Sequence, residues 1–157
     1  MRRNTTILKF ALITIGTVAF LFCLFWLPGI ADLAAEMYPE YGHHGLPVLI
    51  GVYITVIPFY IALHQAFGLL NYIENKKAFS SLAVESLKRI KNCANAIGLM
   101  YGAGMVFLMS QNALHLSIGV IGVVVIFIAS SIALFIAILQ EMLRSAIAIK
   151  SENDLTV

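Results

Sequence analysis

The chain has 157 residues, of which 61% are hydrophobic and 11% are charged, and its formal net charge is +2. About a quarter of the residues of a soluble domain are charged, so this composition excludes a water-soluble globular domain. The length suits one domain. We therefore expect residues 1–157 to form a single all-α integral membrane domain.

Three stretches without Asp, Glu, Lys or Arg predict four transmembrane helices: residues 10–31, 41–73 and 92–140. About 20 apolar residues cross the hydrocarbon core as a helix, and lipid offers backbone groups no partner, which excludes open strands. The third stretch is too long for one helix and contains the polar break Ser110-Gln111-Asn112. The predicted spans are residues 7–27, 46–70, 93–109 and 116–140.

The basic residues predict how these spans are oriented. All ten Lys and Arg lie before or in the first turn of span 1, between spans 2 and 3, or after span 4, and the loop 28–45 has none. Lys and Arg are enriched in cytoplasmic segments. The pattern predicts an N-in/C-in protein with both termini and the segment 71–92 in the cytoplasm.

The segment 71–92 is predicted to be a basic, amphipathic helix. Ser80 or Ser81 can cap a helix, and three apolar residues follow near helical spacing, namely Leu82, Leu87 and Ile90. We expect this helix to lie at the inner membrane surface and to run on into span 3. After span 4 the helix is expected to continue until a polar tail begins at residue 150. We expect this tail, residues 150–157, to be mobile, as the last residues of a chain often are.

Five basic side chains of this segment are the candidates for binding anionic lipid or a cytoplasmic protein: Lys76, Lys77, Lys88, Arg89 and Lys91. Each basic residue near an anionic membrane surface contributes about 1 kcal/mol of attraction. The plainer interpretation is a topology signal with lipid contact alone.

Small residues predict how spans 3 and 4 pack, because they let helix backbones approach in lipid. They recur every four residues in both spans: Ala94, Gly98 and Gly102, then Ala129, Ala133 and Ala137. An antiparallel hairpin along these faces is the favoured arrangement. The alternative is that one face mediates homo-oligomerisation.

Four polar residues within or beside the spans are candidates for lining a solute path: His64, Gln65, Ser130 and Ser131. The plainer interpretation is a histidine bonded to a neighbour and serines bonded to their own backbone. No acidic residue lies in the core of a predicted span, which counts against an ion-coupled carrier and leaves an enzyme without evident acid–base groups.

The loop 28–45 gathers carboxylates and imidazoles, which are ligand types suited to zinc: Asp32, Glu36, Glu40, His43 and His44. Their spacing matches no metal motif, and the plainer interpretation is a solvated acidic loop. We predict no metal site, no cofactor and no catalytic residue.

Three cytoplasmic segments carry a resemblance to a known family: residues 77–80, 83–94 and 149–157, which read KAFS, AVESLKRIKNCA and IKSENDLTV. They resemble the four-span bacterial proteins called domain of unknown function 2975, the YoaS-like proteins, over the whole chain. The resemblance implies a bacterial cell-membrane protein and no established activity. Members of the family are often encoded beside a small helix-turn-helix regulator of the Cro/C1 type, which implies that regulator as a partner.

The leading hypothesis is a non-enzymatic membrane protein whose cytoplasmic face, residues 71–92 and the tail, binds such a regulator without itself contacting nucleic acid. The alternatives are an oligomeric channel or exporter for a small solute and an immunity protein against a membrane-active peptide.

Overall fold

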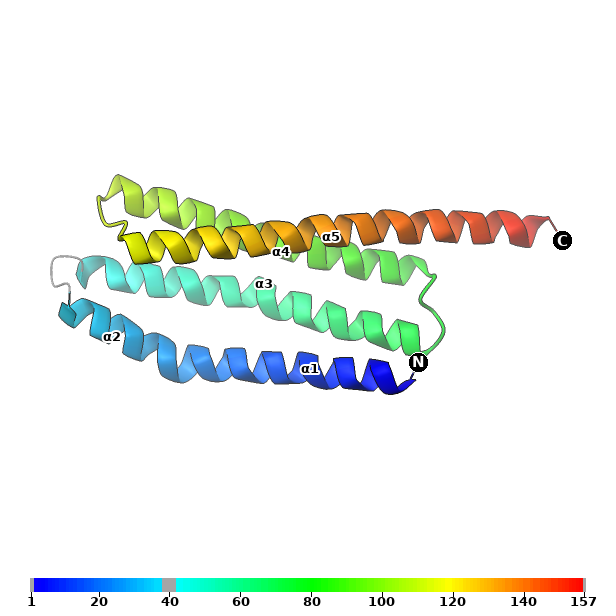
Figure 1. The fold of residues 1–157 in the computed structure, drawn as a ribbon, viewed down its shortest axis with the longest axis horizontal. Helices are drawn as coiled ribbons and strands as arrows, with labels where there is room; N and C mark the ends of the chain where they lie inside the picture. Colours follow the sequence, from blue (N-terminus) through cyan, green and yellow to red (C-terminus); the bar gives the residue numbers. More distant parts are fainter. Residues whose placement is uncertain (1, 38–41, 157) are drawn as a thin grey trace.

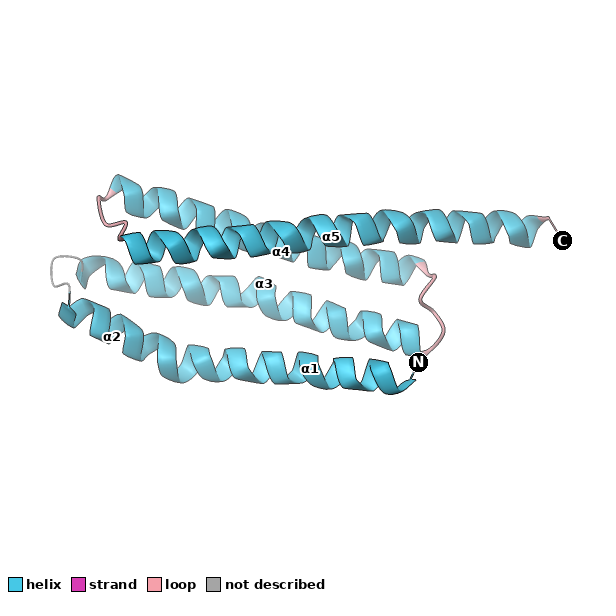
Figure 2. Ribbon diagram, viewed as in Figure 1, coloured by secondary structure: helices cyan, strands magenta, loops and turns pink. Residues whose placement is uncertain are grey.

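The computed structural model describes residues 2–37 and 42–156, and within these ranges every regular element is a helix (Figures 1 and 2). The elements in chain order are α1 (Arg2–Leu21), the π-helical turn η1 (Phe22–Trp26), α2 (Leu27–Met37), α3 (Gly42–Glu74), α4 (Ser81–Ser110) and α5 (Leu116–Leu155). Four helical segments in the described part are long and apolar enough to cross a membrane. The all-α fold with four spans is confirmed.

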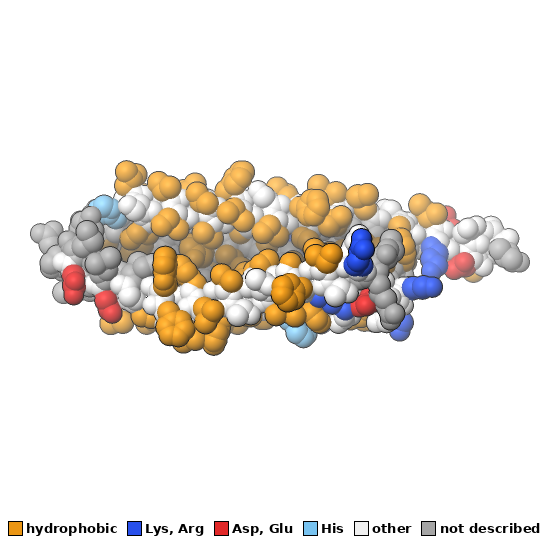
Figure 3. Space-filling model, turned by 60° about the horizontal axis from the view of Figure 1, so that its bottom comes forward, with side chains coloured by type: hydrophobic (Ala, Val, Ile, Leu, Met, Phe, Trp, Pro, Cys, Tyr) orange, Lys and Arg blue, Asp and Glu red, His pale blue; other side chains and the backbone are white. Residues whose placement is uncertain are grey.

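The helices pack in series. α1 lies against α3, α3 against α4, and α4 against α5. Figure 1 shows the N-terminus, the turn between α3 and α4 and the C-terminus at one end of the molecule. We call this end, which holds all ten Lys and Arg residues, the basic end, and we call the opposite one the far end. In Figure 3 hydrophobic side chains cover the length between the two ends, as expected of a surface in contact with lipid.

Two tyrosines of α3 bind the backbone of the N-terminal helical segment. The Tyr60 hydroxyl donates to the Gly16 carbonyl at 2.7 Å, and the Tyr53 hydroxyl donates to the Cys23 carbonyl at 2.7 Å. Seven residues separate the tyrosines and seven separate their acceptors, so each pair repeats after two helical turns on one face. A Cβ on Gly16 would lie 2.8 Å from a methyl group of Leu63, which shows how closely the two helices approach.

The π-helical turn η1 has its cause at Pro28. In this turn the Leu27 N–H donates to the Phe22 carbonyl, five residues back. The next donor in that pattern would be residue 28, and proline has no N–H. Pro28 therefore cannot donate to the Cys23 carbonyl five residues back, and the Tyr53 hydroxyl donates to this carbonyl.

The hairpin of α4 and α5 packs along the predicted small residues. Ala94, Ala129 and Ala133 are each 7% exposed or less. A Cβ on Gly98 would lie 3.7 Å from the Cβ of Ala129, an ordinary contact distance. The predicted hairpin of spans 3 and 4 is therefore confirmed within the chain, but Gly102, which was also predicted to lie in this contact, has open space around its Cα.

Helix extends further than the predicted spans. The segment 28–45, expected as a loop, is helical through Met37 and again from Gly42, because its first part, PGIADLAAEM, is rich in good helix formers. The tail 150–157 continues α5 to Leu155. The Thr156 hydroxyl donates to the carbonyls of Glu152 and Asn153 and so satisfies part of that helix end.

Candidate functional site at the basic end

The basic end has a packed core. Seven buried side chains of the described residues lie there, on four helices: Thr5, Leu70, Ala83, Ser86, Leu87, Ile90 and Gln140, all 9% exposed or less. Apolar groups are driven together in water, whereas lipid supplies no comparable force between helices. Strong burial at this end is therefore expected of a part of the protein that stands in water.

The basic segment was predicted to lie as a helix along the inner membrane surface, across the end of the molecule. The structure shows a different orientation. Residues 81–92 are the first three turns of α4, which continues without a break to Ser110. Its buried face is formed by Ala83, Leu87 and Ile90, while Leu82 is 50% exposed. Because α3 and α5 cover α4 along this length, the helix stands upright between them.

The ends of the turn between α3 and α4 are well defined. The N–H groups of Lys76 and Lys77 donate back to the Ile73 and Tyr72 carbonyls, the pattern of a Schellman motif. Lys76 occupies the left-handed position of this motif with φ 57°, where glycine is usual. Ser80 then caps α4 by accepting from the Ala83 N–H at 3.3 Å, so the predicted cap is confirmed.

The five candidate contact residues differ in how much they are engaged. Lys76, Lys77 and Lys88 are exposed. Arg89 donates to the Glu85 carboxylate at 2.7 Å, and both of these side chains are more than half exposed. The Lys91 amine donates to the Gln140 side chain at 3.2 Å, joining α4 to α5. Contact of all five with lipid or protein stays a prediction; four of them are exposed, and Lys91 is half-buried.

The four polar candidates for a solute path do not meet within one chain. His64 and Gln65 lie on α3, Ser130 and Ser131 lie on α5, and α4 packs between these helices. His64 and both serines are exposed, and the Ser131 hydroxyl donates to the Phe127 carbonyl of its own helix. A path lined by all four would need more than one copy of the chain, and the lining stays a prediction.

The candidate metal ligands are only partly described. Asp32 and Glu36 are exposed on α2. Glu40 and the side chains of His43 and His44 lie outside the described parts. No group of three or more His, Cys, Asp or Glu side chains that could hold a metal ion occurs in the rest of the chain.

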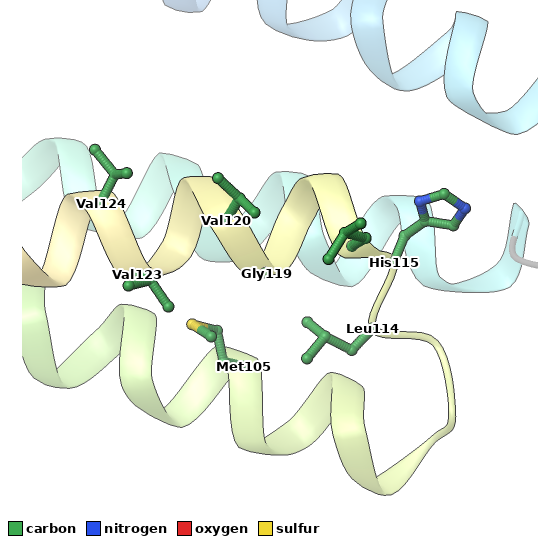
Figure 4. A pocket seen from close by; sticks show the side chains of 8 residues that line it. Met105, Leu114, His115, Gly119, Val120, Val123 and Val124 are labelled. Carbon is green, nitrogen blue, oxygen red and sulfur yellow. The ribbon is translucent and has the colours of Figure 1, made fainter.

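A shallow apolar cavity lies at the far end between α4 and α5 (Figure 4). Its volume is about 550 Å³, and it is lined by Met105, Leu114, His115, Leu116, Gly119, Val120, Val123 and Val124. Met105 points from α4 toward α5, where its sulfur would lie 2.5 Å from a Cβ on Gly122. The lining offers shape and apolar contact and contains no acid–base pair.

A link between α1 and α3 at the basic end was not predicted from the sequence. The Lys9 amine pairs with the Glu74 carboxylate and lies 5.6 Å from the centre of the Phe67 ring. The two charged side chains are 20% and 24% exposed. Since 65 residues separate them, the helix arrangement had to be known before their pairing could be seen.

Comparison with known proteins identifies relatives but no activity. The family model described as "Protein of unknown function (DUF2975)" matches residues 29–157. The chain is 48% identical over 158 residues to a protein of Bacillus subtilis (strain 168) called "Uncharacterized membrane protein YoaS", with 99% of each chain covered. No solved structure matches.

Proposed function

Because the chain belongs to the DUF2975 family, whose description states no function, we propose a function from its own residues: a non-enzymatic, multi-pass protein of the bacterial cell membrane whose basic end binds a small helix-turn-helix regulator. Binding would hold the regulator at the membrane and away from its DNA. The mechanism is sequestration, with no catalytic step.

The charge distribution supports a cytoplasmic basic end. Ten Lys and Arg and five Asp and Glu belong to this end, which leaves an excess of five positive charges: the acidic residues are Glu74, Glu85, Glu141, Glu152 and Asp154. Asp32 and Glu36 belong to the far end. In Figure 3 the Lys and Arg side chains gather toward the basic end. Positively charged loops stay in the cytoplasm, so both termini are assigned to that side.

The observation that carries the proposal is an exposed apolar and basic surface at the start of α4. Phe79 is 58% exposed and Leu82 is 50% exposed, and Lys76 and Lys77 precede them in the turn. Leu82 lies nine residues before Lys91, about 14 Å further out along the helix. Exposed apolar groups are ordinary in lipid, but in water they mark contact surfaces.

The conformation of Lys76 supports the same surface. A non-glycine residue at φ 57° costs about 1 kcal/mol relative to glycine. Backbone strain of this kind is found at functional positions. A binding role of the Lys76 side chain would explain why lysine, and not glycine, occupies this position.

α5 adds a second element to this surface. α4 has 30 residues and ends at the far end, and α5 has 40 residues and begins there, so α5 extends about 15 Å beyond α4 at the basic end. Figure 1 shows this extension clearly. It exposes Ile149 (67%) and Leu155 (84%), and a partner seated on the start of α4 would lie beside it.

The test is crosslinking in native membranes, followed by affinity purification of the tagged chain and mass spectrometry for a Cro/C1-type regulator. Three forms are compared: the full chain, a chain ending at Lys150, and the triple variant Lys76→Glu, Lys77→Glu, Phe79→Ser. We expect recovery with the full chain and a loss of tenfold or more in the other two. Glu36→Gln at the far end is the control and keeps full recovery.

The variant Lys76→Gly separates binding from stability. It relieves the left-handed strain, so we expect higher thermal stability together with weaker recovery of the regulator. Equal recovery from every variant would refute the surface. Absence of the regulator, with solute flux into proteoliposomes or peptide tolerance in cells instead, would favour a channel or an immunity protein.

A further inference from the structure

One face of α4 is covered by neither of its neighbours. α3 and α5 pack on α4 and bury residues such as Ala94 and Leu108. The uncovered side carries exposed residues at alternating steps of three and four, a seven-residue repeat: Asn92, Asn95, Leu99, Val106 and Met109. We call these five residues the asparagine face. Position 102, which completes the repeat, is a glycine with open space around its Cα.

The side chains of Asn92 and Asn95 make no hydrogen bond to any described residue of the chain. Other exposed polar groups of the spans behave differently. The hydroxyls of Thr14, Thr17 and Ser131 each donate to a carbonyl of their own helix. Asn95 lies one turn, about 6 Å, deeper than Lys91, and an unpaired carboxamide in hydrocarbon is unfavourable.

We propose that the asparagine face binds the same face of a second copy of this chain, with the two α4 helices parallel about a two-fold axis along the membrane normal. A carboxamide carries both a donor and an acceptor. Two Asn95 side chains related by a two-fold axis can therefore bond to each other reciprocally. Asparagine drives association of helices in lipid in this way.

The apolar part of the face fits the same geometry. A seven-residue repeat is the pattern of two helices in a left-handed supercoil. Leu99 is 74% exposed and Val106 is 67% exposed, and each would pack on its own copy. The repeat also continues outward to Lys88, whose charge would oppose its copy, so the contact runs from Asn92 toward the far end.

The proposal is independent of the regulator, and cysteine crosslinking tests it. The two free cysteines, Cys23 and Cys93, are first replaced by serine in the full chain. Leu99→Cys and Val106→Cys are then oxidised in bilayers, and each is expected to give a disulfide-linked dimer. Phe127→Cys on α5, which is 71% exposed, is the matched control and is expected to stay monomeric.

A second measurement addresses the asparagine itself. Fluorescence energy transfer between labelled copies is followed while the protein is diluted with lipid. We expect Asn95→Leu to weaken dimerisation about tenfold and Ser130→Ala to leave it unchanged. Crosslinking at Phe127→Cys as strong as at Leu99→Cys would overturn the proposed face, and unaltered energy transfer in Asn95→Leu would overturn the role of the carboxamide.

Discussion

The hydrogen bond from Tyr53 to the Cys23 carbonyl should depend on Pro28. We expect Tyr53→Phe to destabilise the protein much more when residue 28 is proline than when it is alanine. In the native chain the carbonyl loses its replacement donor and is left unpaired in the membrane. In a Pro28→Ala background an N–H is present at residue 28 and can take its place.

The expected magnitude follows from the geometry. The bond is 2.7 Å long, which is the preferred length for a hydroxyl donor. Bonds between membrane helices average about 0.6 kcal/mol and reach about 1.7 kcal/mol. Because Pro28 has no N–H to donate to this acceptor, we expect Tyr53→Phe to cost about 1.5 kcal/mol in the native chain and about 0.5 kcal/mol with Pro28→Ala. The coupling of about 1 kcal/mol is a fivefold change in the folding equilibrium.

The assay is a double-mutant cycle in mixed micelles, with unfolding by SDS followed through the fluorescence of Trp26, the one tryptophan of the chain. Tyr60→Phe is the matched control, since its hydroxyl makes an equally short bond to the Gly16 carbonyl, and no proline occurs in the five residues after Gly16. Its effect should be the same in both backgrounds. Equal losses for Tyr53→Phe with proline and with alanine would refute this origin of the π-helical turn.

Three further predictions concern the helix contacts. Gly16→Leu should separate α1 from α3 and cost about 1–3 kcal/mol in the same SDS titration, whereas Gly51→Leu, with open space around it, should cost little. Ser80→Ala should lose about 1 kcal/mol of helix capping, seen as faster amide exchange in the first turn of α4 and unchanged exchange in α5. Replacing either Lys9 or Glu74 alone by leucine should destabilise by about 2 kcal/mol, and replacing both should restore most of the loss; additive losses would contradict a coupled pair.

The spans could be predicted because each depends on local composition. The lengths of the charge-free stretches predicted four helices, and the four-residue spacing of small residues predicted the close approach of Gly98 to Ala129. The cap at Ser80 is also a local signal. These features need no knowledge of which helices are neighbours.

The remaining features depend on pairs of distant residues. The bond of Tyr53 to Cys23 joins positions 30 apart, and the pair of Lys9 and Glu74 joins positions 65 apart. The sequence contains Pro28 just after predicted span 1, but a proline at such a position predicts that the helix ends there. The helix continues past Pro28, and the Tyr53 hydroxyl on α3 donates to the Cys23 carbonyl at this point.

The depth of burial connects the fold with the proposed surfaces. In the apolar middle the helices need not bury their side chains, so an outward-facing apolar residue such as Phe127 does not by itself indicate a partner. At the basic end the helices do bury a core, and Phe79 and Leu82 are left out of it. Asn95 is the opposite case, because it is a polar side chain that is exposed in the apolar part of the molecule. Each exception is a side chain exposed to the wrong solvent for its chemistry, and we propose that each contacts another protein: a soluble partner at the basic end, and a second copy along α4.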